Sequence, residues 1–285
     1  MQIKAITILC LLGFLPLEMH ASDEGVTRSP PNGRRVYGVR WRKPMVRTGM
    51  HRKVTFSGGR PAMSQARGIL YLANGEGDVL ALKSQSGEIV WRKRIGLPFE
   101  TSVVLFTDND TEFLLLSARD GSVFCLNPHQ GELLWKKKLG SEVRSPWQVK
   151  AGIAYAVTSS DALVAMRIKD GTIKWQKKRA VMKELSIRGS AGVALDDDKV
   201  FAGFSDGYVE AYLLATGERV WSRFLSVDGG EFVDVDADLL VRNGRLYAAS
   251  YSDGVYSMDP QTGRVFWRQE RAAVKHLALG DKGLI

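Results

Sequence analysis

A glycine followed four residues later by a tryptophan recurs five times in this 285-residue chain. The pairs are Gly87 and Trp91, Gly131 and Trp135, Gly171 and Trp175, Gly217 and Trp221, and Gly263 and Trp267. Successive tryptophans are 44, 40, 46 and 46 residues apart. This period is typical of the four-stranded blade of a β-propeller. The chain is therefore expected to fold as an array of similar units.

Further positions keep their residue type when the units are aligned on the tryptophan. Ten residues upstream the residue is small: Ala81, Cys125, Ala165, Ala211 and Ser257. Twenty residues upstream it is aromatic or leucine: Tyr71, Leu115, Tyr155, Phe201 and Tyr247. Fourteen residues upstream it is Gly77, Gly121, Asp161, Gly207 or Asp253. Glycine and aspartate tolerate the positive φ of a tight hairpin turn, so this last position predicts a turn.

Short alternating segments between these positions predict strands. In the first unit they are 69–73, 79–82 and 89–94, and the loop lengths recur downstream. A fourth strand is expected just upstream in each unit, at 60–63, 101–105, 145–149, 190–194 and 236–240. The prediction is an all-β propeller of four-stranded antiparallel blades whose strands run outward in chain order. The tryptophan then lies in the outermost strand, where its ring can pack against the neighbouring blade.

The repeat predicts one propeller domain, although the length alone would allow two. Residues 1–21 predict a secretory signal peptide, because Lys4 precedes an apolar run at 5–17 that is too short to span a bilayer. Residues 22–33 are expected to be a flexible segment, and residues 34–285 the propeller domain.

The formal net charge of +9 would suit nucleic acid, but the basic residues at 92–94, 136–138 and 177–179 directly follow repeat tryptophans on the expected outermost strands. Lysine on an edge strand protects against edge-to-edge aggregation, and we favour this interpretation for an exported chain. No nucleic-acid partner is expected. Attraction to acidic lipid head groups or to an acidic partner surface stays open.

The sequence contains no recognisable catalytic motif, and its four histidines lack metal-ligand spacing, so we expect no catalytic residue and no metal site. Cys125 is expected to be a small buried residue. Asp120 and Asp206 occupy expected turns, where an aspartate can bond local backbone. The acidic run at 196–198 predicts a solvated loop, with a calcium site as the alternative.

Two stretches interrupt the repeat. The first is the long connection from Trp175 to the fourth unit, which contains Leu185, Ile187 and Arg188 in the sequence LSIRGS at 185–190. The second is the insertion after Trp221, which ends in the sequence FVDVDA at 232–237. Loops on a rigid scaffold often carry binding residues, so both are candidate binding segments. Asp234 and Asp236 could also bond backbone at a strand entrance, and the two interpretations are compatible.

The segment SMDPQTG at 257–263, together with Trp267, resembles the PQQ-type propeller repeat family. That family includes quinone-dependent dehydrogenases and non-enzymatic scaffolds. The dehydrogenase alternative implies a quinone cofactor, calcium ligands and vicinal cysteines. Cys125 is the one cysteine outside the expected signal peptide, so we expect no enzyme activity and no cofactor.

The two interruptions, with RPAM at 60–63, resemble the BamB family of outer-membrane-protein assembly factors, and this resemblance runs from about Trp41 to the end. It implies a non-catalytic periplasmic scaffold at the inner face of the outer membrane. The implied partners are the periplasmic domains of BamA, the rest of the Bam complex and unfolded outer-membrane proteins. The contacting residues would be Leu185, Ile187, Arg188, Asp234 and Asp236. Arg188 could alternatively pair with one of the two aspartates inside the protein.

The sequence departs from that family in two ways. No lipobox cysteine is evident, and the family is eight-bladed whereas this chain completes five tryptophan-closed units. We therefore expect a fragment or truncated product with partial blades and an exposed edge. A generic periplasmic protein-binding propeller stays as a further alternative.

Overall fold

The computed structural model describes residues 41–43, 59–99, 101–143, 145–179, 191–225, 234–235, 237–250, 252–270, 274, 277–280 and 283–284. The chain divides into two compact units, residues 1–42 and residues 43–285, and the features below belong to the second. The expected signal peptide at 1–21 and the segment at 22–33 lie outside the described residues.

Five four-stranded antiparallel sheets form the second unit, and their strands neighbour each other in chain order. The first sheet consists of β1 (Ala62–Ser64), β2 (Ile69–Ala73), β3 (Asp78–Lys83) and β4 (Ile89–Arg94). The second consists of β5 (Val104–Asp108), β6 (Thr111–Ser117), β7 (Ser122–Leu126) and β8 (Leu133–Lys138). The third consists of β9 (Gln148–Lys150), β10 (Ile153–Val157), β11 (Ala162–Arg167) and β12 (Ile173–Lys178).

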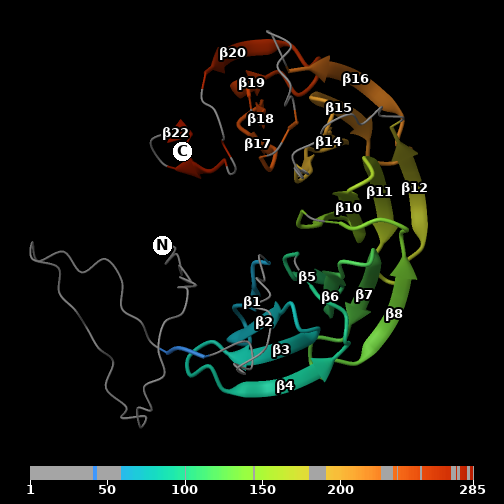
Figure 1. The fold of residues 1–285 in the computed structure, drawn as a ribbon, viewed down its shortest axis with the longest axis vertical. Helices are drawn as coiled ribbons and strands as arrows, with labels where there is room; N and C mark the ends of the chain where they lie inside the picture. Colours follow the sequence, from blue (N-terminus) through green and yellow to red (C-terminus); the bar gives the residue numbers. More distant parts are fainter. Residues whose placement is uncertain are drawn as a thin grey trace, which may run out of the picture. The chain divides into compact units, whose positions relative to one another are not determined.

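The fourth sheet consists of β13 (Ala194–Leu195), β14 (Lys199–Gly203), β15 (Tyr208–Leu213) and β16 (Arg219–Phe224). The fifth consists of β17 (Leu240–Arg242), β18 (Arg245–Ser250), β19 (Gly254–Met258) and β20 (Val265–Gln269). A short hairpin of β21 (Leu279–Gly280) and β22 (Gly283–Leu284) follows, and the described residues form no helix. Within this unit the sheets follow one another side by side, with the fourth strand of each on the outer side (Figure 1). The predicted blades and their outward strand order are confirmed.

The strands around each tryptophan agree closely with the sequence, whereas the first strand of each sheet begins later than expected. β5 begins at Val104 instead of residue 101, because the amide of Val103 donates to the carbonyl of Arg60, just before the first strand of the first sheet, at 3.1 Å. The amide of Leu239 likewise donates to the carbonyl of Gly192, just before the first strand of the fourth sheet, at 3.3 Å, and β17 begins at Leu240 instead of residue 236. These amides therefore join neighbouring sheets before the strand ladder starts.

The turn fourteen residues before the tryptophan is confirmed in all five units, whereas the positive φ expected at this position is found in four of them. Gly77, Gly121, Asp161 and Gly207 have positive φ. In the fifth unit the positive φ, 110°, falls on Gly254 instead of Asp253. The Asp253 carboxylate accepts from Tyr256 and Arg268 of its own sheet, and the positive φ is taken by the following glycine, which begins β19.

The three aligned apolar positions lie in one row across each sheet. In the first sheet Tyr71 pairs with Ala81, which pairs with Trp91. The small residue between the two rings lets them approach, and the Tyr71 and Trp91 ring centroids are 6.1 Å apart. The same arrangement joins Tyr155 to Trp175 at 5.8 Å. Spacings of ten and twenty residues thus follow from cross-strand packing.

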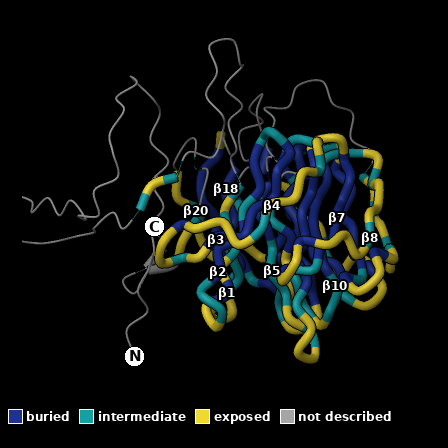
Figure 2. The backbone as a smooth tube through the Cα atoms, turned by 90° about the horizontal axis from the view of Figure 1, so that it is seen from below, coloured by how far each residue is buried: buried dark blue, intermediate teal, exposed yellow. Residues whose placement is uncertain are grey.

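The hydrophobic core consists of layers between neighbouring sheets. One cluster joins the first and second sheets, for example through Tyr71 and Leu114, and further clusters join each later pair. The second and third strands of the sheets are therefore buried, whereas the outermost strands are largely exposed (Figure 2).

Each of the first four repeat tryptophans contacts the neighbouring sheet at one of these junctions. The Trp91 Nε1 donates to the carbonyl of Pro128 in the second sheet's last turn, at 2.9 Å. Equivalent bonds join Trp135 to Ile168, Trp175 to Leu214 and Trp221 to Pro260, at 2.6, 2.9 and 3.0 Å. Beneath each ring lies the repeat glycine of the next unit: Gly131, Gly171, Gly217 and Gly263. The glycine-to-tryptophan spacing is therefore a contact between blades as well as a feature within one.

Candidate partner-binding site

The structure describes the ends of the two interrupting segments, and the first segment's candidate residues lie outside it. Leu185, Ile187, Arg188 and Asp236 are outside the described residues, whereas Asp234 is described and 1% exposed. Arg179 and Ala191 flank the undescribed part of the first segment, and Leu225 and Asp234 flank the undescribed stretch 226–233 of the second. The contacts described below therefore belong to these flanking residues.

One turn of the fourth sheet contacts the ends of both segments. This turn, residues 204–207, connects β14 to β15 and is called the fourth-sheet turn below. The carbonyl of Gly207 accepts from the Leu225 amide at 3.0 Å, and the carbonyl of Phe204 accepts from the Val235 amide at 3.2 Å. At Gly203, just before the turn, a Cβ would lie 2.6 Å from Val235 Cγ1 and 2.9 Å from Ala191 Cβ. The far end of the first segment thus meets both ends of the second here.

The third sheet holds the same turn with two charged side chains. Ser205 donates to Asp161 through its hydroxyl at 2.7 Å and through its amide at 3.1 Å. The Arg179 Nε and Nη2 both donate to Asp206 Oδ2, at 3.0 and 2.5 Å. Arg179 flanks the undescribed part of the first interrupting segment, so the near end of this segment is fixed on the turn as well.

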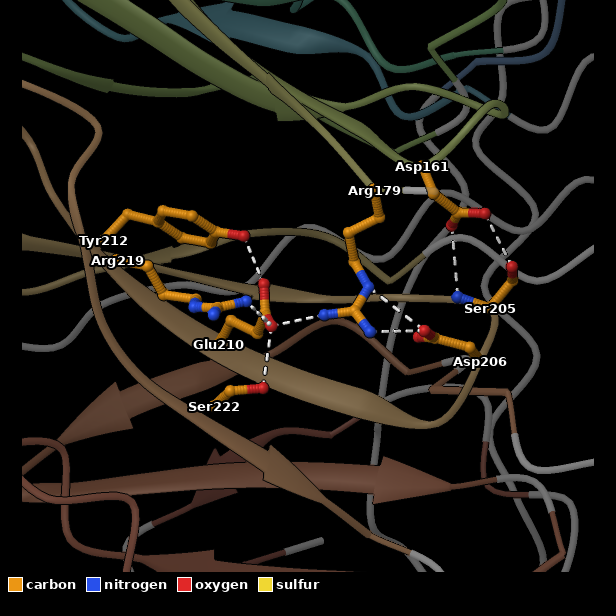
Figure 3. Close-up of polar contacts among 8 residues, drawn as sticks. All are labelled: Asp161, Arg179, Ser205, Asp206, Glu210, Tyr212, Arg219 and Ser222. Carbon is orange, nitrogen blue, oxygen red and sulfur yellow. Dashed lines mark hydrogen bonds and ion pairs between the residues drawn. The ribbon is translucent and has the colours of Figure 1, made fainter. Parts of the chain in front are cut away.

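The rest of the Arg179 guanidinium is enclosed by the fourth sheet. Its carbon lies 4.5 Å from the ring centroid of Tyr208 and 5.3 Å from that of Phe204, in cation–π contact with both. Its Nη1 donates to the carboxylate of Glu210, which has no exposed side-chain surface. Figure 3 shows the guanidinium between the two acidic side chains.

Glu210 collects three further donors. Ser222 Oγ lies 2.7 Å and Arg219 Nη1 3.2 Å from its Oε1, and the Tyr212 hydroxyl donates to its other oxygen. Burial alone would raise the pKa of Glu210, but the hydrogen bonds from Tyr212 and Ser222 and the charge of Arg179 outweigh burial and lower it. Burial, followed by the bond to Glu210, raises the pKa of Tyr212. The carboxylate therefore stays ionised, and the hydroxyl keeps its proton.

Two expectations from the sequence are corrected here. Arg179 does not belong to the basic edge of the outermost strand, because β12 ends at Lys178 and the Arg179 side chain is only 19% exposed. Asp206 binds this guanidinium from the neighbouring sheet, whereas local backbone bonding was expected. The local bonding expected for Asp120 is confirmed, because its Oδ1 accepts from the Ser122 amide at 2.9 Å.

The remaining basic side chains on the outer strands divide between edge protection and internal pairing. Arg92 and Arg94 both pair with Asp78, which has no exposed side-chain surface, and Lys138 pairs with Asp120 at 2.7 Å. Lys93 and Lys137 are exposed on β4 and β8. Part of the expected basic edge is thus paired with acidic side chains of its own sheet, of which Asp78 is buried.

Cys125 is buried, and two aspartates of the acidic run at 196–198 pair with lysine side chains. Cys125 is fully buried as predicted, and burial raises the pKa of its thiol to about 12. In the acidic run, Asp198 pairs with Lys199 at 2.8 Å and Asp197 with Lys150 at 3.6 Å. Among the described residues, no group of three or more His, Cys, Asp or Glu side chains could hold a metal ion. No helix in this part of the chain is long and apolar enough to cross a membrane.

Comparison with known proteins gives one family match. The model of the family of outer membrane protein assembly factor BamB matches residues 23–123 and 106–285. The BamB of Moranella endobia (strain PCIT) is 30% identical over 149 residues, which are 50% of this chain and 38% of that relative. The matched stretches span between 26% and 38% of the length of the curated relatives considered.

Solved structures share the fold. BamB from Moraxella catarrhalis matches with a TM-score of 0.67 at 24% identity, over 79% of this chain and 69% of that one. A quinohemoprotein alcohol dehydrogenase from Pseudomonas putida HK5 matches with a TM-score of 0.60 at 13% identity, over 75% of this chain and 42% of that one. At these identities the likeness establishes the propeller architecture and leaves the activity to the site.

Proposed function

Because the chain belongs to the family of outer membrane protein assembly factor BamB, we propose that it is a non-catalytic periplasmic scaffold that binds the periplasmic domains of BamA. In this role it acts within the Bam complex, at the inner face of the outer membrane, and assists the folding and insertion of β-barrel proteins. The observation that carries the proposal is the meeting of both interrupting segments on the fourth-sheet turn.

Two segments far apart in sequence can form one binding surface only when their bases are fixed close together. The contacts of Leu225 and Val235 with the turn, and the packing of Ala191 near Gly203, provide that condition. A preorganised surface loses less conformational entropy on association, which favours affinity. The described geometry thus supports a composite site on the fourth sheet.

The residue types of the proposed site suit a protein partner. Leu185 and Ile187 would contribute apolar area, and Arg188 a forked donor for a carboxylate or carbonyl group. For Asp234, with 1% exposure, we propose a supporting role at the base of the second segment. Asp236 completes the proposed surface.

The proposal is tested by measuring binding of purified BamA periplasmic domains to the full chain by calorimetry. Arg188→Ala is expected to weaken binding about tenfold or more, as loss of an interface hot spot does. Leu185→Ala should weaken it less. Lys137→Ala is the matched control, because it also removes one positive charge but lies on β8 in the second sheet.

The outcomes separate the function from the site. No binding by the unsubstituted chain would contradict the proposed function. Undiminished binding by both Arg188→Ala and Leu185→Ala would leave the function standing and overturn the residue assignment. Asp234→Ala should lower the unfolding midpoint together with the affinity, and a change in affinity alone would place its carboxylate at the surface.

A further inference from the structure

The junction between the third and fourth sheets is polar at positions that are apolar or aromatic at the other three junctions between described four-stranded sheets. Four residues after the tryptophan, Arg179 aligns with Ile95, Leu139 and Leu225, and with Arg271 of the fifth unit, which lies outside the described residues. Eleven residues before it, Glu210 aligns with Leu80, Phe124, Val164 and Tyr256. Tyr212 aligns with Leu82, Leu126, Met166 and Met258. Arg219 aligns with Ile89, Leu133, Ile173 and Val265.

The polar side chains at these positions contact one another at the junction between the third and fourth sheets. Ile95 packs in the cluster that contains Phe124, and Leu139 packs in the cluster that contains Val164. At the third junction, the corresponding pair is Arg179 and Glu210, joined by an ion pair. An apolar contact of the repeat is therefore replaced by a buried, hydrogen-bonded charge pair at the junction that holds the interrupting segments.

A buried ion pair by itself contributes little to the free energy of unfolding. Desolvation of two charges offsets much of their attraction, and apolar residues of similar volume often stabilise a protein equally well or better. Unlike an apolar contact, the ion pair depends strongly on orientation. The Arg179 guanidinium can donate to both Asp206 and Glu210 in only a few orientations. Its distinctive effect is to fix geometry.

We propose that Arg179 is a positioning residue, which with Glu210 holds the fourth-sheet turn and the described ends of both interrupting segments in the arrangement that partner binding requires. This inference rests on the proposed function. The chain of contacts is continuous: Arg179 binds Asp206 in the turn, Gly207 accepts from Leu225, and Phe204 accepts from Val235.

The test replaces the charge pair with the residues that the repeat uses elsewhere. Arg179→Leu and Glu210→Val restore an apolar pair, and Tyr212→Phe removes the hydroxyl that donates to Glu210. Lys83→Leu with Glu88→Val is the control, because it removes an exposed pair, 2.7 Å apart, in the first sheet and leaves the net charge equally unchanged.

Two quantities are measured beside the unfolding midpoint. One is the affinity of the full chain for the BamA periplasmic domains. The other is the hydrogen exchange of the Leu225 and Val235 amides, which both donate to the fourth-sheet turn. We expect the triple variant to lower the unfolding midpoint only slightly, because the charged side chains that lose a partner, Asp206 and Arg219, are 21% and 58% exposed. It should bind about three- to tenfold more weakly and exchange the two amides about tenfold faster. The control should change neither quantity.

Wild-type affinity together with wild-type exchange in the triple variant would overturn the proposal. If the unsubstituted chain does not bind BamA domains, the proposed function fails, and the exchange measurement still decides whether Arg179 positions the turn. Should the triple variant not fold, Arg179→Lys replaces it, because lysine keeps the charge without the fork. Faster exchange at Leu225 and Val235 in that variant supports the proposal, and unchanged exchange contradicts it.

Discussion

Glu210 shows how a single carboxylate is kept ionised inside a β-sheet. Its side chain has no exposed surface, yet Arg179, Arg219, Ser222 and Tyr212 all donate to it. Leaving one such group unpaired would cost more than forming the network contributes, because a buried charge without partners loses its hydration. Substitutions at this residue therefore report on the ionised network.

The lowered pKa of Glu210 predicts a pH dependence of stability. A group with a folded pKa below its unfolded value, about 4.3, stabilises the fold above that pH. The contribution is lost as the pH falls through the folded value. We expect Glu210→Gln to lower the free energy of unfolding near pH 7, and the difference from wild type to shrink below about pH 4.3.

Urea unfolding of both proteins between pH 7 and pH 3 measures this difference. Glu88→Gln is the control, because Glu88 is exposed and pairs only across a surface turn with Lys83, where an ion pair contributes little. A constant difference between wild type and Glu210→Gln over the whole range would contradict the prediction.

At the scale of the elements, the repeat glycines make a turn in their own blade and also pack against the tryptophan of the preceding blade. Gly171 has a φ of +69°, and a Cβ there would lie 2.8 Å from Trp135 Cε3 in the preceding sheet. Gly244 has the same φ, but a Cβ there would meet nothing within 4 Å. Comparing substitutions at Gly171 and Gly244 therefore distinguishes the effect of backbone strain from the effect of packing between blades.

We expect Gly171→Ala to lower the free energy of unfolding by about 1–3 kcal/mol more than Gly244→Ala. Both variants carry the backbone strain of about 1–2 kcal/mol, whereas only the first forces the tryptophan ring to move. Their effects on the unfolded chain cancel in the comparison. Chemical denaturation measures the free energy of unfolding of both variants. An equal decrease in both would show that the Trp135 ring moves without a loss of stability.

The outermost strands could be predicted because their signals are local. The turn glycine and the tryptophan lie within one hairpin, and β4 has the predicted bounds, residues 89–94. The first strands begin later than predicted because amides such as those of Val103 and Leu239 donate to the preceding sheet. A pairing with another unit leaves no periodic pattern in its own segment, so residue types alone could not place these boundaries.

For the candidate site, the two interrupting segments could be found by the break in the repeat, but the fourth-sheet turn between them could not. Its contacts with Leu225 and Val235 use backbone groups, which the sequence does not distinguish. Arg179 and Glu210 did carry a signal, since the positions that they occupy are apolar in most other units. Reading Arg179 as part of a basic edge missed this signal, because Lys177 and Lys178 precede it directly.

At the scale of the whole molecule, the described core is a series of layers, each shared by two neighbouring sheets. The cluster around Tyr71 and Leu114 joins the first and second sheets, and the cluster around Phe201 and Leu246 joins the fourth and fifth. In repeat proteins of this kind, stability is approximately a sum of unit and nearest-neighbour contributions. A defect at one junction should therefore act mainly on the two sheets that share it.

Gly131→Ala tests this expectation, because a Cβ at Gly131 would lie 2.8 Å from Trp91 Cε3 at the first junction. We expect hydrogen exchange to accelerate in β3, β6 and β7 by about tenfold or more, and to change far less in β15 and β19. Exchange measured by mass spectrometry under native conditions resolves these strands. Equal acceleration in all five sheets would instead mean that the array opens as one cooperative unit, with coupling between sheets stronger than the stability of any single sheet.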